Sequence, residues 1–242
     1  MSDNPMEQFE IKRLLPIEIN GYDISFTNSA LCMIMSALAV VTIFLLCLRK
    51  KSIVPTAAQC VPESAYEFIY NMMVENIGKE GLKYFSFIFT LFLFLCTGNL
   101  LGLFPYSFTF TSHVAAVGTL SLLALLLNIC VGIKRQKWGY LHTFFPKGTP
   151  WAMAPLIIPI EVISLLSKPL SLTIRLAANM TVGHIILKVI AGFVVTICLA
   201  LGWLPLAFTC ILIMFEIFIG ILQAYVYTIL SCIYLGDAFH SH

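Results

Sequence analysis

Charged residues are scarce in this chain, since Asp, Glu, Lys and Arg make up only 11% of its 242 residues. An average soluble domain has about 25% charged and about 45–50% apolar residues, whereas hydrophobic residues make up 60% here. So few charges cannot cover the surface of a soluble globule of this size. Disordered chains are polar and poor in aromatic residues. The composition therefore excludes both classes and predicts an integral membrane protein.

Several sequence signals are absent as well. The eight cysteines are scattered without a CxxC pair, so neither a disulfide framework nor a metal site is expected. The first 26 residues carry five acidic and two basic residues, which fits neither a signal peptide nor a transit peptide. A net charge of +2 without a large basic patch argues against a nucleic-acid partner. No phosphate loop is present, and we expect no nucleotide or other cofactor.

Long apolar segments fill most of the chain. A membrane span needs about 20 apolar residues, and the uncharged runs 29–48, 84–104 and 114–133 predict three spans. The glycine and proline within 201–205 predict a turn between two longer helices, 155–200 and 206–235. Both exceed the thickness of the membrane core, which predicts a tilted hairpin, with Lys168-Pro169 interrupting its first helix. We expect an all-α membrane domain over 1–242, with 1–28 as an N-terminal segment outside.

Residues 57–83 form a different kind of segment. Acidic and polar residues recur every four positions on one face, and apolar residues recur at three and four on another. This pattern predicts an amphipathic helix that is too polar to span the membrane. The helix can lie along the membrane surface or pack against a soluble partner.

Basic residues predict the orientation, because Lys and Arg collect on the inner side of membranes. The loops that follow 29–48 and 114–133 are basic, whereas the loops after 104 and around 202 carry no Lys or Arg. With five spans, the N-terminus is expected outside and the C-terminus inside. No internal repeat of 20–50 residues is evident.

Charged side chains within apolar helices are costly and are functional candidates by default. We place Arg175 near mid-membrane and His184 about 13 Å further outward, by the rise of a helix. Glu216 on the last helix is expected near the level of His184. Gln223 shares a face with Glu216 and is expected near the level of Arg175. The other polar positions on the face of Arg175 are Glu161, Lys168, Ser171 and Asn179.

These residue types suit proton movement. Arginine stays protonated, so Arg175 cannot relay a proton but can attract a partner's carboxylate. Histidine and glutamate can relay protons, and Asn179 can orient water. Other interpretations stay open: Lys168 and Lys188 can extend to the membrane surface, and Glu161 can be an interface residue. The other four histidines, His113 among them, are expected to face solvent.

The run 161–180, EVISLLSKPLSLTIRLAANM, resembles the signature of the subunit a family of F-type ATP synthases. The stretches GNLLGLFPY at 98–106 and QAYVYTIL at 223–230 resemble the same family, and the resemblance covers nearly the whole chain. It implies a non-catalytic stator subunit with two offset half-channels, which load and unload protons on carboxylates of a rotating c-ring. It also implies the peripheral stalk subunit b as a partner.

The resemblance also implies roles for single residues. Arg175 matches the essential arginine that faces the ring, and Asn179 and Gln223 match its polar neighbours. His184 and Glu216 match a pair in the outer half-channel. The weaker candidates for the inner half-channel are Glu161, Lys168 and Ser171. No sodium-type ligand set is present, so protons are the expected ion.

Two alternatives to a proton-conducting stator remain at the level of sequence. One is a stand-alone proton-coupled secondary transporter, which an internal repeat and a substrate pocket would indicate. The other is a non-conducting assembly scaffold. The segments 8–13 and 24–29 resemble alphaproteobacterial and primitive mitochondrial members of the family. We therefore expect a bacterial inner membrane, with the mitochondrial inner membrane as the alternative.

Overall fold

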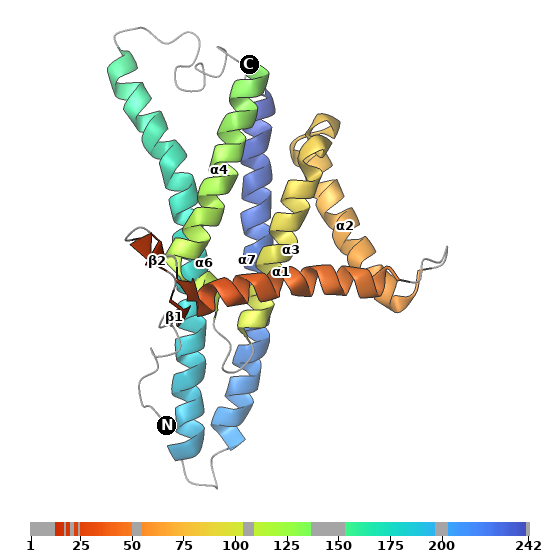
Figure 1. Ribbon diagram of the computed structural model, residues 1–242, viewed down its shortest axis with the longest axis vertical. Coiled ribbons are helices and arrows are strands. Elements are labelled where there is room, and N and C mark those ends of the chain that lie inside the picture. The colour runs from red at the N-terminus through yellow and green to blue at the C-terminus, as the bar shows by residue number, and fades with distance from the viewer. Residues whose placement is uncertain are drawn as a thin grey trace. The chain divides into compact units, whose positions relative to one another are not determined.

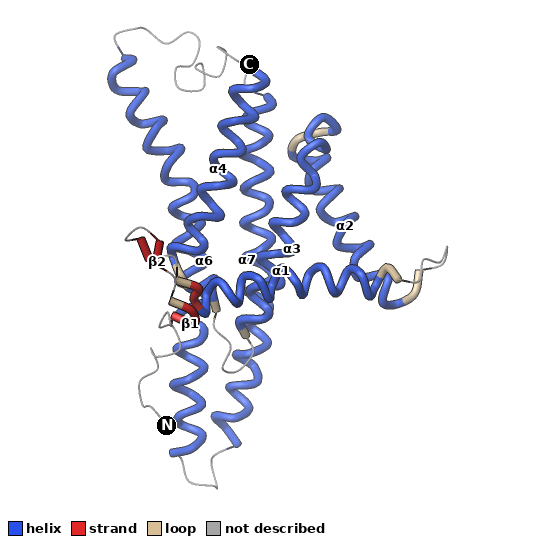
Figure 2. The backbone as a smooth tube through the Cα atoms, viewed as in Figure 1, coloured by secondary structure: helices blue, strands red, loops and turns tan. Residues whose placement is uncertain are grey.

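The computed structural model describes residues 13–16, 18–19, 22–23, 25–49, 55–103, 109–136, 153–196 and 203–240. Helices account for nearly all of them (Figure 2). Within these ranges, five helical segments are long and apolar enough to cross a membrane. The predicted fold class, an all-α integral membrane protein, is therefore confirmed.

The described helices follow the apolar runs of the sequence. The short 3₁₀ turns η2 and η3 lie before the second and third apolar helices. In chain order the helical elements are α1 (Asn28–Cys47), α2 (Ala57–Asn76), η2 (Lys79–Tyr84), α3 (Phe85–Gly102), η3 (Phe110–Ser112), α4 (Val114–Gln136), α6 (Ala154–Thr196) and α7 (Trp203–His240).

Two short strand pairs precede α1, and the sequence pattern does not predict them. Strand β1 (Arg13–Leu15) pairs antiparallel with β4 (Phe26–Thr27), and β2 (Glu18–Ile19) pairs antiparallel with β3 (Tyr22–Asp23). The strands are two or three residues long, so a sequence pattern with a period of two has little room to appear.

The amphipathic segment differs from its predicted extent. The helix predicted for 57–83 ends at Asn76, and η2 follows after Gly78. Gly78 has φ 83°, a left-handed conformation that glycine adopts without steric cost. The chain therefore changes direction at Gly78 before α3 begins.

The predicted interruption at Lys168-Pro169 is wrong, because α6 continues as one helix through both Pro159 and Pro169. Prolines are tolerated in membrane helices where side chains and local adjustments satisfy the freed backbone groups. At this point the Thr173 hydroxyl donates a hydrogen bond of 2.8 Å to the Pro169 carbonyl. Of the turn predicted at 201–205, residues 201–202 lie outside the described ranges, and α7 begins at Trp203.

By its internal contacts the chain divides into two compact units, each drawn from several segments. The first unit comprises 1–46, 93–117 and 175–225. In it, the C-terminal half of α6 and the N-terminal half of α7 lie side by side and run in opposite directions (Figure 1). Asn99 of α3 is fully buried and donates a hydrogen bond of 2.8 Å to the Gly220 carbonyl of α7. A buried polar link therefore joins α3 to α7 in this unit.

The second unit comprises 47–92, 118–174 and 226–242. Arg135 at the end of α4 forms an ion pair with Glu80 of η2, and its guanidinium lies 4.1 Å from the centroid of the Phe239 ring. A Cβ added to Gly236 would lie 2.9 Å from the Asn76 carbonyl oxygen. The end of α7 thus passes close to the end of α2, where glycine leaves room for the backbone.

The charges that predict orientation are only partly described. Arg49, Lys79 and Arg135 lie in the described ranges, whereas Lys50, Lys51, Lys137 and Lys147 lie outside them. Helix α1 exposes most of its apolar side chains, and its buried residues are Ser29 and Ser36. Such a surface suits lipid or a partner helix rather than water.

Candidate functional site

Arg175 lies on the exposed face of α6. Its chain neighbours Leu176 and Ala177 point the other way and are buried at 0% and 4% exposure. Among the described residues, no ion pair or hydrogen bond reaches the Arg175 side chain. A charge within an apolar helix is costly unless it is paired. The Arg175 guanidinium therefore has no charged or hydrogen-bonding partner in the part of the chain that the structure describes.

Asn179, one turn after Arg175, is exposed as well. Its Nδ2 donates to Oε1 of Gln223 on α7 at 3.5 Å, which is a long hydrogen bond. Gln223 is buried, and its Nε2 has no hydrogen-bond partner among the described residues. The structure therefore brings together Asn179 and Gln223, which the sequence places near the level of Arg175.

His184 is buried on the opposite face of α6, at 6% exposure. Its Nε2 lies 3.0 Å from the Thr109 hydroxyl oxygen. The same hydroxyl lies 3.1 Å from the carbonyl oxygen of Gly102, the last residue of α3. A polar chain therefore runs from the end of α3 through Thr109 to the ring of His184.

Glu216 of α7 lies against α6 at the position before His184. Its side chain is 6% exposed, and a Cβ added to Gly183 would lie 2.5 Å from its Oε1 atom. Neither carboxylate oxygen has a hydrogen-bond partner among the described residues. The structure thus places Glu216 beside Gly183 of α6, and among the described residues its carboxylate makes no hydrogen bond to His184.

The three inner candidates are separate from one another. Glu161 is half-buried, whereas Ser171 is exposed. The Lys168 ammonium lies 4.6 Å from the centroid of the Tyr234 ring. This is a cation–π contact, so Lys168 packs on α7 instead of only extending toward the membrane surface. No contact joins these three side chains within the described part of the chain.

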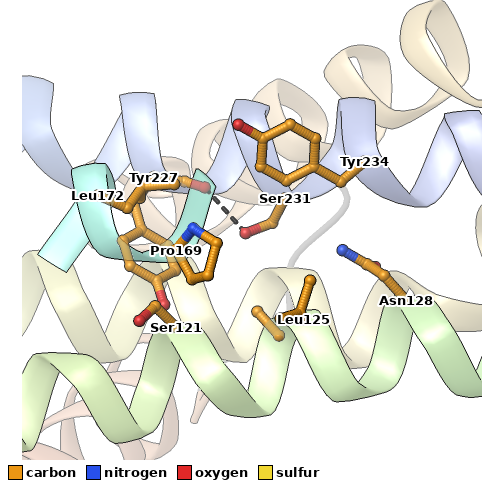
Figure 3. Close-up of a pocket in the computed structure, with 9 residues that line it drawn as sticks. Ser121, Leu125, Asn128, Pro169, Leu172, Tyr227, Ser231 and Tyr234 are labelled. Atoms are coloured by element: carbon orange, nitrogen blue, oxygen red, sulfur yellow. Dashed lines mark hydrogen bonds between the residues drawn. The ribbon is translucent and has the colours of Figure 1, made fainter. Parts of the chain in front are cut away.

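A small cavity in the second unit lies between α4, α6 and α7 (Figure 3). Its volume of about 10 Å³ is close to the space for the centre of one water molecule. The Asn128 Nδ2 atom is buried there without a hydrogen-bond partner among the described residues. The other polar lining residues are Ser121, Tyr227, Ser231 and Tyr234. The cavity is just large enough for a single ordered water beside the Asn128 amide.

Sequence reasoning missed the cavity residues and two residues that contact His184 and Glu216. Tyr227, Ser231 and Tyr234 follow one another at four and three residues, so polar periodicity within the apolar helix would have found them. Thr109 is 75 residues from His184 in the chain, and no local pattern marks Gly183. Only the packing of separate segments identifies those two.

His113 is partly buried, which corrects the expectation that it faces solvent. It lies between η3 and α4, outside the apolar spans. Burial lowers the pKa of His113 below its ordinary value, because desolvation disfavours the charged imidazolium.

In the described ranges, no three His, Cys, Asp or Glu side chains lie close enough together to hold a metal ion.

Comparisons with a family model and with known proteins all point to the same family. The family model described as "ATP synthase A chain" matches residues 30–236. A protein of Rhodospirillum rubrum called "ATP synthase subunit a" is 48% identical over 239 residues, which cover 99% of each chain. Proteins of the same name from Paramagnetospirillum magneticum and Ehrlichia chaffeensis are 49% and 44% identical. Those alignments cover 99% and 100% of both chains, respectively.

Proposed function

The chain belongs to the ATP synthase subunit a family, and we propose that it carries protons through two offset half-channels to the carboxylates of a c-ring. It is a multi-pass, non-catalytic membrane subunit of the ATP synthase complex. The stand-alone secondary transporter has no support, because the whole chain aligns with ATP synthase subunits.

The observation that carries the proposal is the position of Arg175. This side chain is exposed on an apolar helix, and within the described residues it has no ion pair or hydrogen bond. A guanidinium stays charged at any working pH and needs a partner in the low-dielectric membrane. A carboxylate brought by a neighbouring subunit supplies that partner.

Arg175 then acts as an electrostatic barrier. A deprotonated carboxylate is attracted to the guanidinium, whereas a positive charge is repelled, so protons do not pass directly between the two half-channels. Asn179 and Gln223 lie beside this position on α6 and α7. Their amides are suited to orient the guanidinium and water.

We assign the outer half-channel to His184 and Glu216. Both side chains are buried at 6% exposure in the first unit. The Glu216 carboxylate oxygens have no protein partner among the described residues, which leaves them able to bind water or a transferred proton. For the inner half-channel the candidates remain Glu161, Lys168 and Ser171, all on the N-terminal half of α6.

Membership of the family supports our assignment of partners and of a membrane to this chain. The c-ring covers the exposed face that carries Arg175 and Asn179. We assign subunit b of the peripheral stalk to the exposed apolar surface of α1, which few of the described residues cover. The alphaproteobacterial relatives favour the bacterial inner membrane as the location.

Replacing Arg175 tests the proposal. Arg175→Ala is expected to abolish ATP-driven proton pumping in inverted membrane vesicles while the complex still assembles. The matched control is Ile174→Ala, which truncates the adjacent side chain, exposed on the same helix. Coupled pumping that survives in Arg175→Ala would refute the proposed function.

A further inference from the structure

The turn at 109–112 is packed between α3 and α6 in the first unit. Thr109, Phe110 and Thr111 are each at most 2% exposed. A Cβ added to Gly98 of α3 would lie 2.6 Å from the Phe110 ring, so α3 leaves room for this ring only because residue 98 is glycine. The turn is thus fixed against α3 by shape.

The same turn contacts α6 through polar atoms. The Thr181 hydroxyl lies 3.5 Å from the Ser112 carbonyl oxygen, and Thr109 contacts His184 three residues further along α6. Thr181 and His184 are one turn apart and share a face of the helix. The turn therefore has a fixed position relative to the His184 ring.

The hydrogen atoms available to the contacts between Gly102, Thr109 and His184 can be counted. A threonine hydroxyl has one hydrogen to donate and two lone pairs to accept with. The Thr109 hydroxyl oxygen lies 3.1 Å from the Gly102 carbonyl, which can only accept. If the single hydrogen of Thr109 goes to that carbonyl, the hydroxyl can only accept at its contact with His184. The contact of 3.0 Å then requires a hydrogen on Nε2 of His184.

The Gly102 carbonyl is a suitable acceptor for that hydrogen. The carbonyls in the last turn of a helix have no donor within the helix and are satisfied by other groups. The Thr109 methyl group also packs on this residue, because a Cβ added to Gly102 would lie 2.6 Å from Thr109 Cγ2. Both ends of the Thr109 side chain are therefore held by α3.

We propose that Thr109 is a positioning residue, which holds the His184 ring in place and fixes the tautomer with the hydrogen on Nε2. The identity of the protonated nitrogen in a histidine is set by the hydrogen bonds that the ring makes. This inference rests on the proposed function, in which His184 belongs to the outer half-channel. Thr109 itself carries no proton between the two sides, because its hydrogen is engaged with Gly102.

Two substitutions separate the hydroxyl from the methyl group. Thr109→Val keeps the packing on Gly102 and removes both hydrogen bonds, whereas Thr109→Ser keeps the hydroxyl and removes the methyl group. Thr111→Val is the matched control, because Thr111 lies in the same turn at 0% exposure. Its hydroxyl has no hydrogen-bond partner among the described residues.

The assay is ATP-driven proton pumping by the whole complex in inverted vesicles, together with passive proton conduction, per assembled copy of this chain. Of the two hydrogen bonds that Thr109→Val removes, loss of the one to the buried His184 ring should lower both rates about five- to tenfold. Thr109→Ser and Thr111→Val should each stay within about twofold of the unaltered chain, by the same reasoning. If Thr109→Val lowers the amount of assembled chain, Thr109→Ala and Thr109→Ser are compared instead.

Two outcomes overturn the inference. Equal rates in Thr109→Val and Thr111→Val would mean that the hydroxyl of Thr109 has no role. A loss in Thr109→Ser that is larger than the loss in Thr109→Val would mean that the methyl packing matters and the hydroxyl does not. Arg175→Ala is measured in parallel: a loss of pumping there, with no effect of Thr109→Val, would overturn this inference and leave the proposed function in place.

Discussion

Gly183 leaves the space that the Glu216 carboxylate occupies, and Gly183→Ala should therefore impair proton transport without unfolding the chain. A Cβ at position 183 would lie 2.5 Å from Oε1 and 3.0 Å from Cδ of Glu216. Ordinary contact begins near 3.4 Å, so the oxygen must move by about 0.9 Å. Because Oε1 is the end of a flexible side chain, Glu216 can make this movement without a change in the backbone.

The expected stability change is small because two effects oppose each other. Alanine is favoured over glycine within a helix by about 0.5–1 kcal/mol. An off-rotamer Glu216 costs about 0.5–1.5 kcal/mol. The two contributions nearly cancel, so the assembled amount should be unchanged. A displacement of about 1 Å at a reacting group can lower a rate about 10- to 100-fold, and we expect the proton-pumping rate to fall within that range.

The control for Gly183→Ala is Gly192→Ala on the same helix. Apart from the neighbouring backbone of α6 itself, no atom in the described part of the chain lies within 4 Å of a Cβ at Gly192, so this substitution adds the same methyl group without displacing a side chain. Pumping in inverted vesicles should stay near the unaltered rate in Gly192→Ala. Combining Gly183→Ala with Glu216→Asp, which shortens the acidic side chain by one methylene, should restore part of the rate. Equal pumping by Gly183→Ala and Gly192→Ala would refute this account of Glu216.

Two further predictions concern stability. Asn99→Ala removes the buried hydrogen bond to the Gly220 carbonyl and should destabilise the chain by about 1–3 kcal/mol; an unchanged melting temperature of the purified complex would contradict this. Burial lowers the pKa of His113, so its contribution to stability is complete above its ordinary pKa of 6.5 and falls as the pH drops below that value. His113→Gln should therefore lessen the fall in melting temperature between about pH 7 and 5.5, and an unaltered pH dependence would show that His113 does not cause it.

The apolar runs predict the membrane helices well, because each span must satisfy its backbone hydrogen bonds internally and present apolar side chains to lipid. For example, α1 begins at Asn28 and α4 at Val114, within one residue of the predicted starts. The sequence is less informative where the backbone conformation of one residue decides whether a helix ends or continues. The left-handed φ of Gly78 ends the amphipathic helix early, and Pro169 lies within an unbroken α6.

Candidate charges can be found from sequence, but the residues that hold them cannot. Arg175, His184 and Glu216 stand out because a charge or imidazole in an apolar helix is costly. Thr109 and Gly183 are common residue types, and their importance depends on contacts between separate segments. The His184–Thr109 distance of 3.0 Å is set by the packing of the 109–112 turn on two helices. Helical periodicity within α6 contains no information about that packing.

The burial of the candidate residues divides them by the partner that each requires. Glu216 and His184 are enclosed by this chain's own helices, so their positions can be set by Gly183 and Thr109. Arg175 and Asn179 are exposed on α6, so the described part of the chain does not provide the low-dielectric surroundings in which the guanidinium charge acts strongly. Under the proposed function, a neighbouring subunit supplies these surroundings and completes the site around Arg175. If protons take the proposed outer half-channel, substitutions at Gly183 and Thr109 should affect passive proton conduction and coupled pumping alike, because both processes use that path.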